Sequence, residues 1–210
     1  MDLSQYGTDW FNPTSQNAET TKHSVATSTE LIDAIKKSQP RDIIELTAAS
    51  YELSNSLKIN KMLTIKSADA TQKSSILFKG EAGVPAFEMN PKGQLTLESI
   101  KLMGNKQNYA FASLRENMSS NNGLELSAED DDKGDYNAEN VLISECTFKD
   151  VDKNVLDYYR GGYDESTVGG NLIVKGSTFT GCGKKEKNGI LINTYGIINV
   201  KILDNTFVNN

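Results

Sequence analysis

Apolar residues recur first at the spacing of a helix and then at the spacing of strands. Leu31, Ile32 and Ile35 share one helical face behind N-capping hydroxyl residues, and lysines close the last turn. This pattern predicts a short amphipathic helix over Ser28–Lys37 that ends before Pro40. Beyond it, apolar and polar residues alternate, which is the period of half-buried strands.

A frame of apolar positions repeats along the chain. The segments "LTLESIKL", "VLISECTF", "LIVKGSTF" and "VKILDNTF" share the same offsets, and the last three end in Thr-Phe. Phe148, Phe179 and Phe207 are 31 and 28 residues apart, about one coil of a parallel β-helix. Since stacked coils bury each other's apolar faces, we expect these rings to form one inward column. The matching positions are Leu95, Leu97 and Leu102; Val141, Ile143 and Phe148; Leu172, Val174 and Phe179; and Val200, Ile202 and Phe207.

The predicted fold is all-β, a right-handed parallel β-helix (a solenoid) with a short N-terminal capping helix. A β-sandwich would need hairpin signals every 8–12 residues or so, and the candidates are few. We interpret residues 1–26 as a polar lead-in or linker and residues 27–210 as the β-helix domain. A last coil without a capping element would expose unpaired backbone groups that can pair with other chains. This favours a natural protein that continues beyond Asn210.

Composition narrows the classes of function. The net charge of −6 argues against nucleic acid as a partner, because phosphate binding needs a concentrated basic face. The apolar runs are too short to span a membrane, and Met1–Trp10 has no signal-peptide pattern. The single histidine, His23, lies in the polar N-terminal segment, which argues against a Ser-His-Asp triad.

The two cysteines suggest a structural role. Cys146 and Cys182 lack CxxC spacing, which argues against a zinc site. Cys146 shares its frame position with Ser177 and Asn205, so we expect it to be a buried, inert thiol. Cys182 falls outside this position, and a bridge between the two is not expected.

A family resemblance rests on the segment "NVLDYYRGGYDEST", residues Asn154–Thr167, and on "LIVKGSTF" and "GILINTYGIINVKILDNTF" after it. These residues resemble the C-terminal β-helix domain of two-domain polysaccharide lyases of family 6, the alginate lyases and chondroitinase B. "SLKINKMLTIKS" and "LTLESIKLMG" fit the same domain, so the resemblance covers about residues 27–210. It implies an acidic, alginate-like polysaccharide as ligand, an N-terminal catalytic β-helix domain as partner, and a periplasmic or extracellular location. It also implies calcium as the ion that neutralises the uronate, although no metal ligand is assigned in this chain.

The resemblance also bears on catalysis. In such enzymes a lysine and an arginine serve β-elimination, because cations offset the negative charge that develops beside the uronate carboxylate. An overlay on the catalytic coils places Arg160 at the lysine and Thr194 at the arginine, and threonine cannot supply a cation. The resemblance therefore implies a module that binds or positions a uronate polysaccharide. Two alternatives stay open: a lyase with Arg160 as catalytic residue, and a purely structural solenoid that packs on a partner domain.

Candidate sugar-binding residues concentrate in the C-terminal coils. Tyrosines stack on pyranose faces, an arginine holds a carboxylate bidentately, and lysines on one face attract a polyanion. The alternative interpretation is an ion pair from Arg160 to Asp164 or Glu165 within a glycine-rich loop, with the lysines as solvated surface. The predicted substrate-binding residues are Tyr158, Tyr159, Arg160, Tyr163, Asp164, Glu165, Lys175, Tyr195 and Lys201.

An acidic run, Glu129–Asp132 with Asp135, contains oxygen ligands of the kind calcium prefers. Its spacing misses the EF-hand pattern, because Gly134 stands where a third carboxylate is needed. We interpret this run as an exposed acidic loop.

Overall fold

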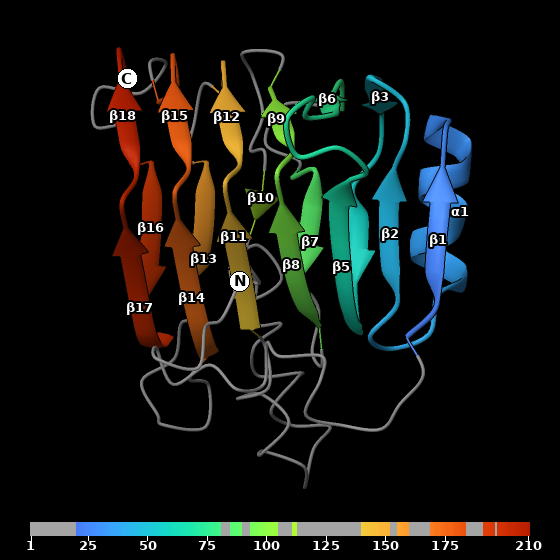
Figure 1. Ribbon diagram of the computed structural model, residues 1–210. Coiled ribbons are helices and arrows are strands. Elements are labelled where there is room, and N and C mark those ends of the chain that lie inside the picture. Colours follow the sequence, from blue (N-terminus) through green and yellow to red (C-terminus); the bar gives the residue numbers. More distant parts are fainter. Residues whose placement is uncertain are drawn as a thin grey trace, which may run out of the picture.

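Strands dominate the structure. The computed structural model describes residues 20–80, 85–89, 93–104, 111–112, 140–151, 155–159, 169–183, 191–195 and 197–210. Within these ranges the chain forms one helix and three sheets, in which every strand pairing is parallel (Figure 1).

Each sheet is a row of strands that follow one another in chain order. Sheet A has seven strands: β1 (Lys22–Val25), β2 (Ile43–Leu46), β5 (Met62–Ser67), β8 (Gln94–Glu98), β11 (Asn140–Ser144), β14 (Gly169–Lys175) and β17 (Ile197–Leu203). Sheet B has six: β3 (Ser50–Leu53), β6 (Ser75–Phe78), β9 (Lys101–Met103), β12 (Thr147–Lys149), β15 (Thr178–Thr180) and β18 (Thr206–Val208). Sheet C has five: β4 (Leu57–Ile59), β7 (Phe87–Met89), β10 (Phe111–Ala112), β13 (Leu156–Tyr159) and β16 (Ile192–Tyr195).

The chain visits the three sheets in rotation. From β11 in sheet A it passes to β12 in sheet B and β13 in sheet C, and then returns to sheet A as β14, beside β11. We call one such passage a turn. The predicted architecture of parallel strands with a single N-terminal helix is confirmed at this level.

The repeated frame corresponds to the pairing of strands between turns. Val141 pairs with both Leu95 and Leu172, and Phe148 pairs with both Leu102 and Phe179. All six side chains are buried in the single core that the sheets enclose. Because alternate residues of a strand point to opposite faces, the frame residues line the interior and the residues between them face outward.

The predicted phenylalanine column is confirmed. The ring centroids of Phe148 and Phe179 are 4.8 Å apart, and those of Phe179 and Phe207 are 4.9 Å apart, both pairs stacked nearly parallel. This spacing is the distance between neighbouring strands. Phe207 is 48% exposed because β18 lies at the edge of sheet B, whereas the other two rings are fully buried.

Left-handed backbone at the corners allows short strands to meet at a sharp angle. The first residue after the sheet A strand in each of the last four turns has a φ of 52–58°: Ser99, Glu145, Gly176 and Asp204. A second set follows the sheet B strands at Asp150, Gly181 and Asn209. Glycine, Asp and Asn tolerate this region best, so five of the seven corner residues are of a favoured type.

Helix α1 (Ser28–Lys37) has the predicted bounds. Thr27 and Glu30 form a capping box, in which the Thr27 hydroxyl accepts from the Glu30 backbone N–H and the Glu30 carboxylate accepts from the Thr27 backbone N–H. Leu31 and Ile35 are buried where the helix packs against the N-terminal strands, including β3 and β4 at the edges of sheets B and C (Figure 1). In the described ranges no helix combines the length and apolarity that crossing a bilayer requires.

The first sheet strand begins earlier than the sequence suggests. β1 lies within residues 1–26, which the sequence analysis takes as a lead-in, and it pairs along its length with β2. Sheet A therefore starts at Lys22 rather than after residue 26.

Candidate functional site

The predicted tyrosine cluster falls partly on strand β13. Tyr158 and Tyr159 end this strand, and their backbones pair with those of Thr194 and Tyr195 in β16. Two of the predicted tyrosine positions are thus direct neighbours across sheet C. The other predicted members of the cluster lie outside the described residues: Arg160, Tyr163, Asp164 and Glu165.

The two predicted lysines lie on the same face of sheet A. Lys201 pairs with Ile173, so Lys175 stands two residues further along the neighbouring strand. Leu172 and Val174 point into the core, which places Lys175 and Lys201 on the outer face, where both are partly buried. The structure thus brings the lysines together, but on a different sheet from the tyrosine strands.

The predicted acidic loop, Glu129–Asp132 with Asp135, lies outside the described residues. Within the described ranges, no group of three or more His, Cys, Asp or Glu side chains has the arrangement of a metal site.

Both cysteines are free and buried. Burial raises the pKa of Cys146 to about 12 and also raises the pKa of Cys182, so neither thiol is set up as a nucleophile. The predicted column is present as a chain of hydrogen bonds between turns. The backbone N–H of Cys146 donates to Ser177 Oγ at 3.1 Å, and that of Ser177 donates to Asn205 Oδ1 at 2.8 Å.

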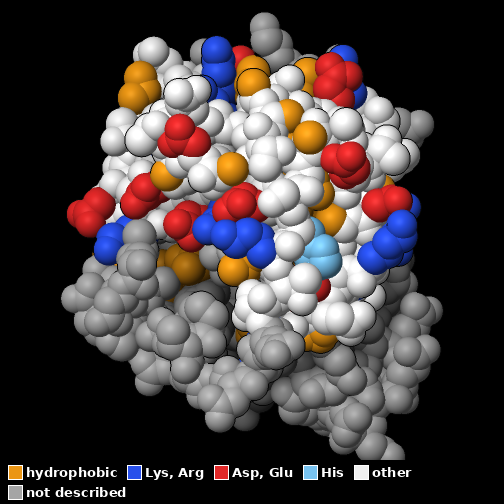
Figure 2. Space-filling model, turned by 45° about the vertical axis from the view of Figure 1, so that its right-hand side comes forward, with side chains coloured by type: hydrophobic (Ala, Val, Ile, Leu, Met, Phe, Trp, Pro, Cys, Tyr) orange, Lys and Arg blue, Asp and Glu red, His pale blue; other side chains and the backbone are white. Residues whose placement is uncertain are grey.

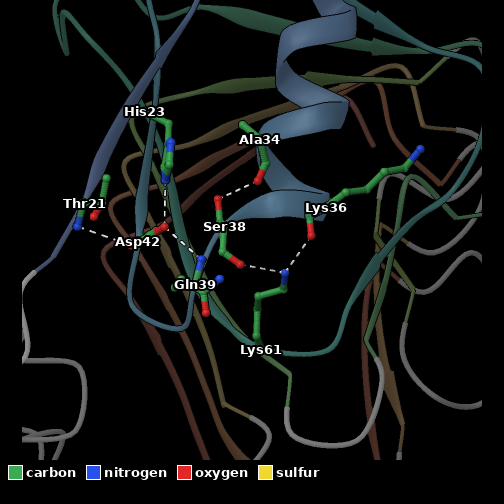
Figure 3. Close-up of polar contacts among 8 residues, drawn as sticks. All are labelled: Thr21, His23, Ala34, Lys36, Ser38, Gln39, Asp42 and Lys61. Atoms are coloured by element: carbon green, nitrogen blue, oxygen red, sulfur yellow. Dashed lines mark hydrogen bonds and ion pairs between the residues drawn. The ribbon is translucent and has the colours of Figure 1, made fainter.

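A buried carboxylate at the start of sheet A escaped the sequence analysis. Asp42 accepts hydrogen bonds from His23 Nε2 at 2.7 Å and from the backbone N–H groups of Gln39 and Thr21 at 2.8 and 3.3 Å (Figure 3). Burial opposes ionisation of Asp42, but these hydrogen bonds outweigh it and hold its pKa below the ordinary value. The arrangement ties β1 to the segment after α1, which is a structural role.

Charges on the outer face around β1 and β2 compensate one another. Glu45 Oε1 lies 3.3 Å from Lys22 Nζ and 3.7 Å from Lys66 Nζ. Figure 2 shows acidic and basic side chains side by side on this face, near the histidine. The described residues on this face therefore do not form a continuous basic surface that could bind a polyanion.

A cavity of about 380 Å³ lies between the last turn of α1 and strand β4. Lys36, Lys58 and Lys61 line it, together with Ser56 and the apolar side chains of Ile35 and Leu57. Lys61 Nζ donates to the backbone carbonyls of Lys36 and Ser38 at 3.0 and 2.8 Å, which fixes its ammonium at the C-terminal end of the helix (Figure 3). No pattern in the sequence pointed to these lysines as a group. Two of them flank Ile59-Asn60 in the sequence, and the third belongs to helix α1.

The structure resembles a polysaccharide lyase. It is similar to the family 6 (PL6) alginate lyase AlyGC, with a TM-score of 0.51 and 16% sequence identity, over 92% of this chain and 39% of that enzyme. The likeness shows a shared fold. A mutant form of AlyGC is also similar, with a TM-score of 0.42 and 15% identity, over 95% of this chain and 39% of the mutant. The chain thus spans well under half the length of these enzymes. No protein-family model and no curated protein matches the sequence.

Proposed function

We propose that this chain is a carbohydrate-associated module that binds or positions a uronate polysaccharide such as alginate. In this proposal its three sheets form a right-handed parallel β-helix that corresponds to the C-terminal domain of a family 6 lyase. The observation that carries the proposal is the structural likeness to an alginate lyase over 92% of this chain. The match covers 39% of that enzyme.

The proposed binding surface is the Tyr158–Glu165 side of the C-terminal turns. Adjacent tyrosine positions in β13 and β16 provide stacking platforms for pyranose rings, and Arg160 provides a bidentate contact to a carboxylate. A chain with a net charge of −6 repels a polyuronate at long range, so attraction must come from local cations. Lys175 and Lys201 supply such cations on the adjoining sheet.

The proposed module has a partner domain, a location and an accompanying ion. It places the chain beside an N-terminal catalytic β-helix domain, in the periplasm or outside the cell, with calcium accompanying the uronate. The module comprises the predicted domain of residues 27–210 together with strand β1.

Calorimetric titration with alginate oligosaccharides tests the binding surface. We expect weak binding by the parent chain at low salt, reduced in the Tyr159→Ala/Arg160→Ala double variant and falling as salt is raised through the physiological range. Lys79→Ala is a matched control, because it removes one cation just after β6, where Lys79 Nζ lies 2.8 Å from Glu52 Oε1. Unchanged affinity in the double variant, or no binding by the parent, leaves the purely structural solenoid as the better explanation.

A spectroscopic assay tests the non-catalytic part of the proposal. Products of β-elimination carry a conjugated double bond that absorbs in the ultraviolet. We expect no increase in absorbance when the chain is incubated with alginate or chondroitin sulfate and calcium. A steady increase that Arg160→Ala abolishes would show that the chain is itself a lyase.

A further inference from the structure

The cavity between α1 and β4 is a second place where this acidic chain concentrates positive charge. Its volume of about 380 Å³ falls within the range of roughly 300–1,000 Å³ that is usual for small-molecule sites. The described residues that line it include three lysines and no acidic side chain. Ile35 and Leu57, which are almost fully buried, form the apolar base of the cavity.

The three cations differ in how they are held. Within the described part of the chain, the Lys36 and Lys58 ammonium groups have no ion-pair partner, whereas the neighbouring Lys37 is paired with Asp33 at 3.0 Å. Lys61 uses two of its three N–H donors on the carbonyls at the end of α1 and keeps one for a ligand. A fixed ammonium loses little conformational entropy when it binds an anion.

A buried hydroxyl supports the same interpretation. Ser56 lines the cavity, and its Oγ is buried without a hydrogen-bond partner among the described residues. Leaving such a group unsatisfied destabilises a fold. An acceptor on a ligand that reached the hydroxyl through a small shift of the cavity wall would remove this cost.

We propose that the α1–β4 cavity is a subsite for the carboxylate of an acidic sugar, with Lys36, Lys58 and Lys61 as its cationic contacts and Ser56 as a hydrogen-bond donor. The choice of a uronate rests on the proposed function. The site itself rests on the charge and geometry of the cavity. It is separate from the tyrosine surface of the C-terminal turns, so a long polyuronate would have two independent points of attachment.

An NMR titration of the ¹⁵N-labelled chain with an alginate tetrasaccharide tests this inference, with a neutral glucose tetrasaccharide as the comparison. We expect the amide signals of Leu57, Lys58 and Asn60 to shift with the uronate and to stay in place with the neutral sugar. The shifts should persist in the Tyr159→Ala/Arg160→Ala variant, which separates this subsite from the proposed tyrosine surface of the C-terminal turns. No shift at these amides at low salt would overturn the inference, even where binding elsewhere is seen.

Matched variants test which cations matter. Lys36→Gln/Lys58→Gln removes two cavity lysines, and Lys37→Gln/Lys66→Gln removes two lysines that pair with Asp33 and Glu45 outside the cavity. We expect the first pair to weaken the cavity titration about tenfold and the second to change it less than about twofold. Equal weakening by both pairs would mean that only net charge matters and would overturn the assignment.

Two further variants probe specificity. Ser56→Ala should weaken the cavity titration while leaving the unfolding midpoint unchanged or higher, because it removes an unsatisfied hydroxyl. Glu88 lies opposite Lys58 in the neighbouring strand, and Glu88→Gln should strengthen the titration by removing a competing negative charge. An unchanged titration in Ser56→Ala would remove the hydroxyl from the proposed site, and a weaker one in Glu88→Gln would contradict an anionic ligand.

Discussion

The phenylalanine column allows a quantitative test of how the turns are held together. Phe179→Ala removes the middle ring, which is fully buried and stacked on Phe148 at 4.8 Å and on Phe207 at 4.9 Å. Truncating a core phenylalanine costs about 3–5 kcal/mol, which includes the energy of the cavity that remains. Because the variant also loses two stacked pairs, each worth about 0.5–1.5 kcal/mol, we expect a loss in the upper part of that range.

Phe207→Ala is the matched control for this prediction. Phe207 belongs to the same column but stacks on one ring only and is 48% exposed, so we expect about half the loss, roughly 2 kcal/mol. Urea unfolding followed by circular dichroism gives both values from the midpoints, provided that the m-values match the parent's. Equal losses in the two variants, or a loss below about 1.5 kcal/mol for Phe179→Ala, would refute the idea that the column is a continuous packed core.

The remaining predictions concern individual polar groups. Because hydrogen bonds depress the pKa of Asp42, the stability that they contribute is complete above the ordinary pKa of about 4 and is lost as the pH falls through the folded-state value. Asp42→Ala should therefore be less stable at neutral pH and should show a flatter acid dependence of its urea midpoint; a parallel curve would contradict this account. Cys146, with its pKa raised to about 12, should resist alkylation at pH 8 in the folded chain and react fully in urea, and rapid labelling without urea would refute its burial. Tyr51→Phe removes the hydroxyl that donates to the Val25 carbonyl at 2.6 Å and accepts from the Ala48 N–H at 2.9 Å. It should cost about 1–3 kcal/mol and speed amide hydrogen exchange in β1, whereas exchange at the parent's rate would show that this bond does not hold the strand.

A frame that repeats from turn to turn was sufficient to predict parallel strands stacked on one another. The frame that ends in Phe148 and Phe179 identified strands that do pair, because residues on the same face of stacked strands must bury their side chains together. Helix α1 was equally predictable from its capping residues and from the spacing of Leu31 and Ile35, because both signals are local in the sequence.

The candidate site was harder to predict from the sequence, because it depends on which distant residues the connecting segments place next to one another. Tyr159 and Tyr195 were predicted from their residue type and their place in the C-terminal coils, but their pairing across sheet C required the register of β13 and β16. Lys175 and Lys201 share a face of sheet A, as expected, yet the sequence did not show that the tyrosine strands belong to a different sheet.

Tertiary structure alone decided the contacts at the N-terminal end of the sheets. His23 and Asp42 belong to segments on either side of α1, and no periodic pattern links them. The α1–β4 cavity likewise joins Lys36 of the helix to Lys58 of a strand that follows two intervening strands. A hydrophobic period reports which side chains face the core, because burial recurs with the geometry of each element. It carries no information about which polar side chains contact one another outside the core. Those contacts depend on the conformation of the segments that connect the helix and the strands, and only the folded structure specifies that conformation.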